Sequence, residues 1–378
     1  MKQEKLNVLL VANVAKEHVL KFHLPTIRQM RELGWNVDVA CAGDEPVPYC
    51  NHQFKMSYKR SPFSFKTIKG IRELKKIIDS NNYDVVYCHT PVGGAVARIA
   101  ARKMRTRKMR TKGLKVIYMA HGFHFYRGAP ILNWLLYYPI EKALSKYTDA
   151  IITINQEDFR NASERLLCKT IFIVNGIGLD LSRFYAPKSS SLRAEYRSEL
   201  GIPQDAVVMI YLAELIENKN QTLLMDALKI LRDNGKNVYL LLAGVDHHNG
   251  RDMQYAKEIK VDPFVRYLGW RNDIENLYDV SDVCTASSIR EGFGINLLEA
   301  MASGLPVVAT DNRGHTTIIC DGENGYLVPL NDPEAMADKV LLALKNKDAL
   351  INNYHLDKYE SEAIVNRIIE IISATYSE

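Results

Sequence analysis

Short apolar runs alternate with longer amphipathic stretches along almost the whole chain. The first run covers residues 7–12, and after a polar loop the apolar residues recur at helical spacing as far as Gly34. A short apolar run between two helical stretches is typical of a buried parallel strand, so the pattern predicts an α/β fold. Further strand-length runs lie at residues 37–41, 83–88, 115–120, 150–154, 171–174, 206–212, 238–244, 265–269, 281–286 and 305–309.

The alternation of strand and helix starts again after a polar, proline-bearing segment at residues 186–191. A chain of 378 residues also exceeds the size of one typical core. Both observations predict two α/β domains, covering residues 1–186 and 187–356. Residues 357–378 are predicted to add a C-terminal helix with an apolar face.

The most informative segment is the loop at residues 287–294, which lies between a predicted strand and a predicted helix. Such a loop lies at the carboxyl end of a parallel strand, where open α/β sheets bind ligands. Gly292 and Gly294 allow the backbone to approach a ligand closely. The N–H groups of Ile295 and Asn296 at the helix start could receive a phosphate.

Two glutamates accompany this loop. Glu291 would face the ligand from the loop, and Glu299 lies further along the helix, where a carboxylate can accept hydrogen bonds from a vicinal diol such as a ribose. The other interpretation is an ordinary strand-to-helix turn with two solvated glutamates. The residues alone leave both interpretations open.

A family resemblance favours the first interpretation. The sequence EGFG at residues 291–294, EAMASG at 299–304 and GLPVVA at 304–309 resembles the glutamate-x7-glutamate signature of glycosyltransferase family 4, a family of retaining nucleotide-sugar glycosyltransferases. The resemblance implies the GT-B fold: two facing Rossmann-like domains with parallel sheets, an inter-domain cleft that holds the donor, and a C-terminal helix that crosses back to the first domain.

The resemblance also implies roles for individual residues. His121 follows the predicted strand at residues 115–120, where relatives place an active-site histidine that hydrogen-bonds the donor sugar; without the family, a histidine after a strand is more often structural. Lys219 matches a lysine that binds the donor diphosphate, whereas Glu214 stands where arginine is usual, and a carboxylate there would repel phosphates. The expected catalytic residues are His121 and Glu291, and the expected donor-binding residues are Lys219, Glu214, Phe293, Gly294, Ile295, Asn296, Leu297, Glu299 and Arg271.

Other chemistries lack their motifs. No D-x-D pattern is present, so a metal-bridged diphosphate is not expected, and neither a P-loop nor a G-x-G-x-x-G fingerprint occurs. The six cysteines are scattered without a C-x-x-C pair, which disfavours a zinc site and a disulfide framework. We expect neither a metal nor a cofactor.

Four features keep two interpretations each. His18 and His23 are as easily surface residues as substrate contacts. The turn at residues 89–94 could line the cleft or cap a helix, and the aromatic helix at residues 134–140 could pack on the core or settle on a membrane interface. The basic block at residues 102–115 contains a tandem repeat; it could attract anionic lipid or a diphosphate-linked substrate, or form a solvated helix end and loop.

Composition restricts the setting. The chain is 47% hydrophobic and 25% charged with a formal net charge of +5, as in ordinary soluble proteins. No apolar run approaches the roughly 20 residues that span a bilayer, so a cytoplasmic location is expected, with association at the membrane face left open. No nucleic-acid partner is expected, because no interleaved aromatics accompany the basic block.

The sequences at residues 120–126 and 133–139 resemble the bacterial capsular and exopolysaccharide branch of the family. The resemblance implies transfer of a hexose or N-acetylhexosamine from a UDP-sugar to a polyprenyl-diphosphate-linked acceptor. Two other functions stay open: a GT-B nucleotide-sugar epimerase, which needs no acceptor, and a non-catalytic nucleotide-sugar-binding protein, which has no need of His121.

Overall fold

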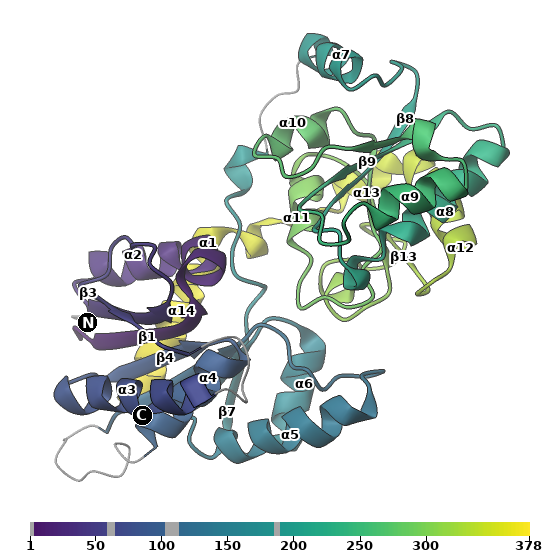
Figure 1. Cartoon of the computed structure of the whole chain (residues 1–378). Helices are drawn as coiled ribbons and strands as arrows, with labels where there is room; N and C mark the ends of the chain where they lie inside the picture. The colour runs from purple at the N-terminus through teal and green to yellow at the C-terminus, as the bar shows by residue number, and fades with distance from the viewer. Residues whose placement is uncertain (1–3, 59–64, 103–112, 185–189) are drawn as a thin grey trace. The chain divides into compact units, whose positions relative to one another are not determined.

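The computed structural model describes residues 4–58, 65–102, 113–184 and 190–378, and the chain forms two compact units (Figure 1). Unit 1 comprises Met1–Gly178 and Lys358–Glu378, and unit 2 comprises Leu179–Asp357. The sequence placed the first boundary after residue 186. The chain passes to unit 2 earlier because the Phe184 ring packs edge-on against Tyr278, with the centroids 6.0 Å apart, and Arg183 pairs with Glu275.

Unit 1 contains a seven-stranded parallel sheet in the order β3-β2-β1-β4-β5-β6-β7. The central strands are almost continuously apolar and buried, as both faces of the sheet are covered. Its strands are β1 (Asn7–Val14), β2 (Asn36–Ala42), β3 (His52–Lys55), β4 (Val85–His89), β5 (Lys115–Ala120), β6 (Ala150–Thr153) and β7 (Thr170–Ile173). Its helices are η1 (Ala15–Val19), α1 (Leu20–Phe22), α2 (Leu24–Glu32), α3 (Phe65–Ser80), α4 (Pro91–Ala101), α5 (Ile131–Ser145), α6 (Gln156–Arg165) and α14 (Ser361–Ser377).

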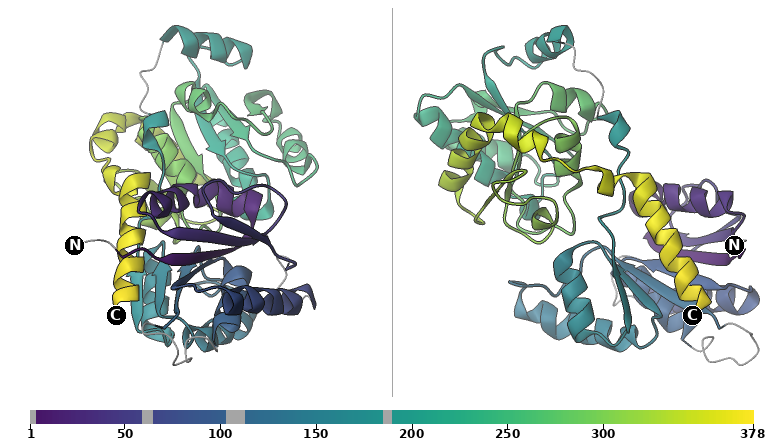
Figure 2. Two further views of the ribbon diagram at one scale, coloured as in Figure 1. Left: turned by 90° about the vertical axis from the view of Figure 1, so that its left-hand side faces the viewer. Right: turned by 180° about the vertical axis from the view of Figure 1, so that it is seen from behind.

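The C-terminal helix α14 belongs to unit 1, although the chain reaches it only after unit 2. It contacts α2 and β5, and Figure 2 shows it in yellow beside α2. Ile364, Ile368 and Ile372 are buried, so the apolar face expected from the sequence docks on this unit. The crossing of the last helix back to the first Rossmann-like unit, part of the predicted fold class, is confirmed.

Helix α4 lies unusually close to the sheet. A Cβ atom at Gly94 would lie 2.5 Å from the Tyr118 ring, so only glycine permits this approach. The same gap admits the fully buried Arg98, whose guanidinium lies 4.0 Å from the centre of that ring and pairs with Glu141 of α5 at 2.8 Å. A buried ion pair therefore joins α4 to α5.

The structure distinguishes between core packing and membrane contact for the aromatic residues of helix α5. Trp134, Tyr137 and Tyr138 pack against the unit 1 core, which confirms core packing for the aromatic side chains. The aliphatic side chains of the same helix behave differently, since Leu132 and Leu135 are 66% and 68% exposed. One helix thus has an aromatic inner face and an aliphatic outer face.

Unit 2 repeats the architecture with a six-stranded parallel sheet in the order β10-β9-β8-β11-β12-β13. Its strands are β8 (Val207–Leu212), β9 (Val238–Ala243), β10 (Val265–Tyr267), β11 (Val283–Ala286), β12 (Val307–Thr310) and β13 (Tyr326–Val328). Its α-helices are α7 (Ser190–Glu199), α8 (Gln221–Asp233), α9 (Arg251–Glu258), α10 (Ile274–Asp279), α11 (Ile295–Ala302), α12 (Pro333–Lys345) and α13 (Lys347–Asn352). Its 3-10 turns are η2 (Leu181–Arg183), η3 (Glu217–Lys219), η4 (Asp262–Phe264) and η5 (His315–Thr317), and η6 (Asp357–Tyr359) leads back to unit 1.

Two parallel-sheet Rossmann-like units confirm the predicted α/β fold class. Within the described ranges, no helix is both long enough and apolar enough to cross a bilayer. Most of the basic block, residues 103–112, and most of the proline-bearing segment, residues 185–189, lie outside the described residues.

Candidate functional site

Buried hydroxyl groups hold the loop between β11 and α11, residues 287–294, in place. We call it the Glu291 loop. Ser287 and Ser288 are fully buried, and Ser287 Oγ donates to the carbonyl of Lys219 at 2.7 Å. Ser288 Oγ donates to Glu291 Oε1 at 2.6 Å, so Tyr211, whose hydroxyl lies 2.6 Å from the same oxygen of Ser288, is the donor in that second contact. Burial raises the pKa of the Tyr211 phenol, which keeps it a donor.

Lys219 pairs directly with the carboxylate of Glu291. The side chains are 23% and 16% exposed, so neither charge faces open solvent. From the sequence we expected Lys219 to serve the diphosphate and Glu291 to serve the sugar. The structure brings the two together, because the turn after β8 lies beside the Glu291 loop: the Ile289 N–H donates to the carbonyl of Asn218 at 2.8 Å.

A third segment, which follows β12, supports the Glu291 loop from the other side. Thr310 Oγ1 and Asn312 Nδ2 donate to the carbonyl of Ser288 at 2.6 and 2.9 Å. Gly314 lies directly against Glu291, since a Cβ atom there would be 2.5 Å from the Glu291 Cβ. We did not select these residues from the sequence. Their position after the strand that neighbours β11 was the available signal, because parallel strands end at the same edge.

Helix α11 begins where a ligand could meet its amide groups. Gly294 is the N-cap, and its carbonyl accepts hydrogen bonds from the N–H groups of Leu297 and Leu298. The first two helical residues, Ile295 and Asn296, precede these donors, and a helix that starts at Ile295 offers their N–H groups no acceptor. Asn296 Nδ2 is buried and has no hydrogen-bond partner among the described residues. Leu297, also expected in the donor site, is fully buried and its N–H already donates to the carbonyl of Gly294, while Phe293 is half-buried.

Glu299 is on α11, with its carboxylate close to Tyr278. Its Oε2 accepts a hydrogen bond from the Tyr278 hydroxyl at 3.0 Å. Burial raises the pKa of Glu299 above its ordinary value, while that hydrogen bond and the charge of Arg183 oppose the rise. Glu299 is thus half-buried and already oriented by one donor.

Glu214 and Arg271, the remaining predicted donor-binding residues, have other neighbours. The Glu214 side chain is 57% exposed, and its Oε2 lies 3.9 Å from His247 Nε2. Arg271 makes two hydrogen bonds with Asp273, of 2.7 and 2.5 Å. Trp270 beside it is 64% exposed, as a residue at the rim of a site would be.

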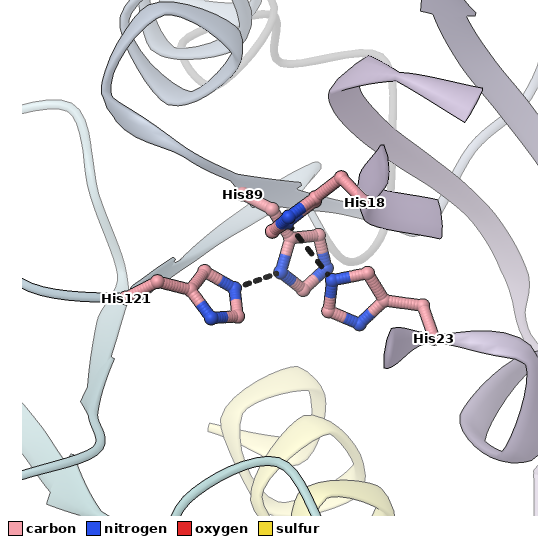
Figure 3. A group of neighbouring side chains, drawn as sticks. All are labelled: His18, His23, His89 and His121. Carbon is pink, nitrogen blue, oxygen red and sulfur yellow. Dashed lines mark hydrogen bonds between the residues drawn. The ribbon is translucent and has the colours of Figure 1, made fainter. Parts of the chain in front are cut away.

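In unit 1, His121 lies in a group of four histidines at the carboxyl edge of the sheet, which we call the histidine cluster: His18, His23, His89 and His121 (Figure 3). His89 is the last residue of β4 and His121 follows β5 directly. His18 lies in η1, and His23 lies between α1 and α2. His124 is elsewhere, stacked on Tyr137 with ring centroids 4.5 Å apart.

Burial sets the protonation of this cluster. It is the main cause that lowers the pKa of His23, His89 and His121, and Coulombic interactions with neighbouring histidines lower each further. These three rings are therefore neutral at neutral pH. His23 is only 2% exposed, so the interpretation of His23 as a surface residue was wrong.

Comparison with known proteins agrees with this geometry. A family model described as "Glycosyl transferases group 1" matches residues 193–359, and one described as "Glycosyl transferase 4-like" matches residues 7–155. A protein of Bacillus subtilis (strain 168), named as the glycosyltransferase EpsD, is similar to this chain. It is 43% identical over 85% of this chain and 84% of its own length. The chain belongs to glycosyltransferase family 4. It is a glycosyltransferase of the GT-B type.

Two further matches come from a comparison of sequences and a comparison of structures. The UDP-Gal:alpha-D-GlcNAc-diphosphoundecaprenol alpha-1,3-galactosyltransferase of Escherichia coli is 27% identical over 78% of this chain and 77% of its own length. The crystal structure of Anabaena Alr3699/HepE in complex with UDP matches with a TM-score of 0.78 at 18% identity, covering 98% of this chain and all of that one. At this identity the second match shows the shared fold.

Proposed function

We propose that this family 4 enzyme is a retaining glycosyltransferase of bacterial surface-polysaccharide synthesis. It transfers a hexose or N-acetylhexosamine from a UDP-sugar to a polyprenyl-diphosphate-linked saccharide. The name of the Escherichia coli relative, with a UDP-sugar donor and a diphosphoundecaprenol acceptor, supports both substrate classes. The observation that carries the proposal is the Glu291 loop, with an oriented carboxylate, a lysine and a helix start in one place.

The donor diphosphate is assigned to the start of α11. Departure of the nucleotide builds negative charge on the phosphate, and fixed N–H donors stabilise such charge without rearranging. The unpaired Nδ2 of Asn296 supports this assignment, because a buried donor without a partner costs about 1–3 kcal/mol that a ligand oxygen would recover. Lys219 lies in the same region, and its ammonium has three N–H donors, so it can bind a phosphate oxygen while it stays paired with Glu291.

Glu291 is assigned to the sugar hydroxyl groups. Lys219 and Ser288 both reach its Oε1, and these contacts fix the carboxylate while Oε2 can accept from a hydroxyl. The acceptor hydroxyl attacks the anomeric carbon from the face that the diphosphate leaves, and the departing phosphate takes its proton. This sequence retains the anomeric configuration without a covalent enzyme intermediate, and no cofactor takes part in it.

Glu299 is assigned to the ribose, and His121 to the donor sugar. The half-buried Glu299 carboxylate can accept hydrogen bonds from a diol. Tyr278 already fixes one oxygen of that carboxylate. Arg271, beside the exposed Trp270, is assigned to the rim near the base.

Contact with the membrane face is assigned to α5. Ile131, Leu132 and Leu135 are exposed aliphatic residues on one short stretch of this helix. Such side chains can enter the interfacial region of a bilayer, particularly beside cationic residues. A lipid-linked acceptor would place the enzyme at that surface.

Incubation with radiolabelled UDP-sugars, with and without a membrane lipid extract, tests the proposal. We expect label in the lipid fraction only when the extract is present. Epimerised donor without an acceptor would indicate an epimerase, and binding of UDP without turnover would indicate a non-catalytic protein. A His121→Ala variant should retain UDP affinity and lose transfer.

A further inference from the structure

The four imidazole rings of the histidine cluster converge from different elements of unit 1 (Figure 3). One nitrogen from each ring lies within 4.8 Å of the other three. His18 Nε2 and His23 Nε2 are 3.1 Å apart, and His89 Nδ1 and His121 Nε2 are 3.3 Å apart. Four nitrogens bound tetrahedrally to one Zn²⁺ at about 2.0–2.1 Å would lie about 3.4 Å from one another. The first separation therefore already matches a metal site, while the second is a hydrogen-bond contact between His121 and Nδ1 of His89.

His89 supplies an independent observation. Its side chain is fully buried, and its Nε2 has no hydrogen-bond partner among the described residues. A buried polar atom in that state costs about 1–3 kcal/mol. The contact with His121 uses Nδ1 of His89 and leaves Nε2 with this cost. A cation bound at Nε2 of His89 removes the cost, with Nε2 of His121 turning from His89 to the cation.

The chain reaches this arrangement through an unusual turn. His18 and His23 are five positions apart, and in a regular α-helix the second would point about 140° away from the first. Here the segment begins as a π-helical turn, η1, in which the Leu20 N–H donates to the carbonyl of Ala15. Turns of this kind are frequent at functional sites, where they redirect side chains.

The type of ligand indicates the type of cation. The group that the described residues bring together contains histidine alone. Imidazole nitrogen suits Zn²⁺ and its transition-metal neighbours, whereas Mg²⁺ and Ca²⁺ require oxygen ligands. The buried rings of His23 and His89 are also in the neutral form that binds metals.

We propose that the histidine cluster binds one Zn²⁺ ion through one nitrogen of each of its four rings. His23 and His89 provide buried ligands, and the half-buried His18 and His121 provide access from solvent. The expectation of a metal-free protein rested on the missing carboxylate motif and on the cysteine spacing. Neither pattern reports on histidines that meet only after folding.

A zinc ion is compatible with the role proposed for His121, a point that rests on the proposed function. The Nε2 of His121 faces the cluster. Ligation through Nε2 leaves the hydrogen on Nδ1, and metal-bound histidines usually donate that hydrogen to a second group. Here a sugar hydroxyl could be the acceptor.

Calorimetric titration of the untagged, chelator-treated full chain with ZnCl₂ tests the site. We expect one high-affinity Zn²⁺ per chain and a higher Tm in the loaded protein. Titration with Co²⁺ should produce the visible absorption of a tetrahedral nitrogen-ligated ion. These measurements report metal binding, so their outcome does not depend on whether the protein transfers a sugar.

Variants identify the ligands. His18→Gln changes a half-buried side chain and should fold; we expect zinc affinity to fall by more than about 100-fold, the upper end of the loss seen when a group supporting a ligand is removed. His18→Cys should restore binding and shift the Co²⁺ spectrum toward sulfur ligation. His355→Gln, at an exposed position, is the matched control and should bind as the wild type does. Absence of stoichiometric zinc in the wild type, or unchanged affinity in both His18→Gln and a folded His89→Asn variant, would overturn the proposal.

Discussion

The two units use the same architecture, but unit 1 gathers neutral polar groups and unit 2 gathers a charged pair. Each has a parallel sheet, and in each the candidate residues stand at the carboxyl ends of neighbouring strands. Unit 1 assembles the histidine cluster there, with rings that burial keeps neutral. Unit 2 assembles a lysine and a glutamate that neutralise each other, fixed by buried hydroxyl groups.

The comparison shows two ways of placing titratable groups out of solvent. A buried charge is costly unless it is paired, so a buried group either changes its protonation state or gains a partner. The histidine cluster follows the first route, and the Glu291 loop follows the second. The two sites should therefore respond differently to acid and to the loss of one partner.

We expect the largest effect at the buried ion pair of Arg98 and Glu141 in unit 1. As in the Glu291 loop of unit 2, a partner of opposite charge compensates for burial here. Glu141→Gln leaves the guanidinium of the fully buried Arg98 without its counter-charge, and removing one partner of such a pair costs about 3–5 kcal/mol of unfolding free energy. Hydrogen exchange should show earlier opening of α4 and α5. Asp233→Asn in unit 2 breaks an exposed pair with Lys229 and should cost only about 0.3–0.5 kcal/mol. Equal losses in the two variants would refute the distinction.

Glu291→Ala should come next. Loss of a fixed group that acts on the reacting sugar typically lowers turnover by about 10²–10³-fold. Because Glu291 is assigned to the sugar, the affinity for UDP should stay unchanged in calorimetry. Ser288→Ala keeps the carboxylate and removes one donor to it, so turnover should fall only about tenfold. Wild-type turnover in Glu291→Ala would reject its role.

Acid should destabilise unit 1 more than unit 2. His23 and His89 have lowered pKa values in the folded state, so below pH 6.5, the ordinary histidine value, the unfolded chain binds protons that these rings do not. Stability then falls as the pH decreases, by about 1.4 kcal/mol per pH unit for each ring, until the folded rings titrate. Hydrogen exchange between pH 7 and 5, in the presence of chelator, should show this loss in β4 and β5. In unit 2 one buried histidine, His315, has a lowered pKa, so β11 should change less. A uniform response would contradict the comparison.

The smallest of these effects should be a loss of nucleotide affinity. Glu299→Ala removes an acceptor assigned to the ribose and should weaken UDP binding by about 1–3 kcal/mol, or roughly 5- to 150-fold. Glu334→Ala removes an exposed carboxylate of α12 that has no assigned role, and it should leave the affinity unchanged. Equal affinities in Glu299→Ala and the wild type would remove Glu299 from the site.

Sequence patterns succeeded where the relevant residues are neighbours along the chain. Buried strands and helix faces repeat over a few positions, so the two parallel sheets and the docking face of α14 could be predicted. The Glu291 loop and the start of α11 are likewise one continuous segment. The pairing of Lys219 with Glu291 could not be predicted, because the two residues are 72 positions apart and meet only when the turns after β8 and β11 lie together.

The histidine cluster shows the same limit more strongly. Its members come from η1, the start of α2 and the ends of two strands, and no spacing rule connects them. His121 was selected through family resemblance alone, and His23 was thought equally suited to the surface. The π-helical turn that directs His18 toward His23 has no sequence signature that we could use. Where a site depends on a local irregularity, the sequence names the residues without placing them.

The central claim is that the nucleotide binds beside the Glu291 loop, and a crystal structure of the protein with UDP tests it most directly. We expect the diphosphate against the N–H groups of Ile295 and Asn296, with the ribose hydroxyls on the Glu299 carboxylate. A nucleotide bound away from α11, with Glu299 still hydrogen-bonded only to Tyr278, would contradict the account.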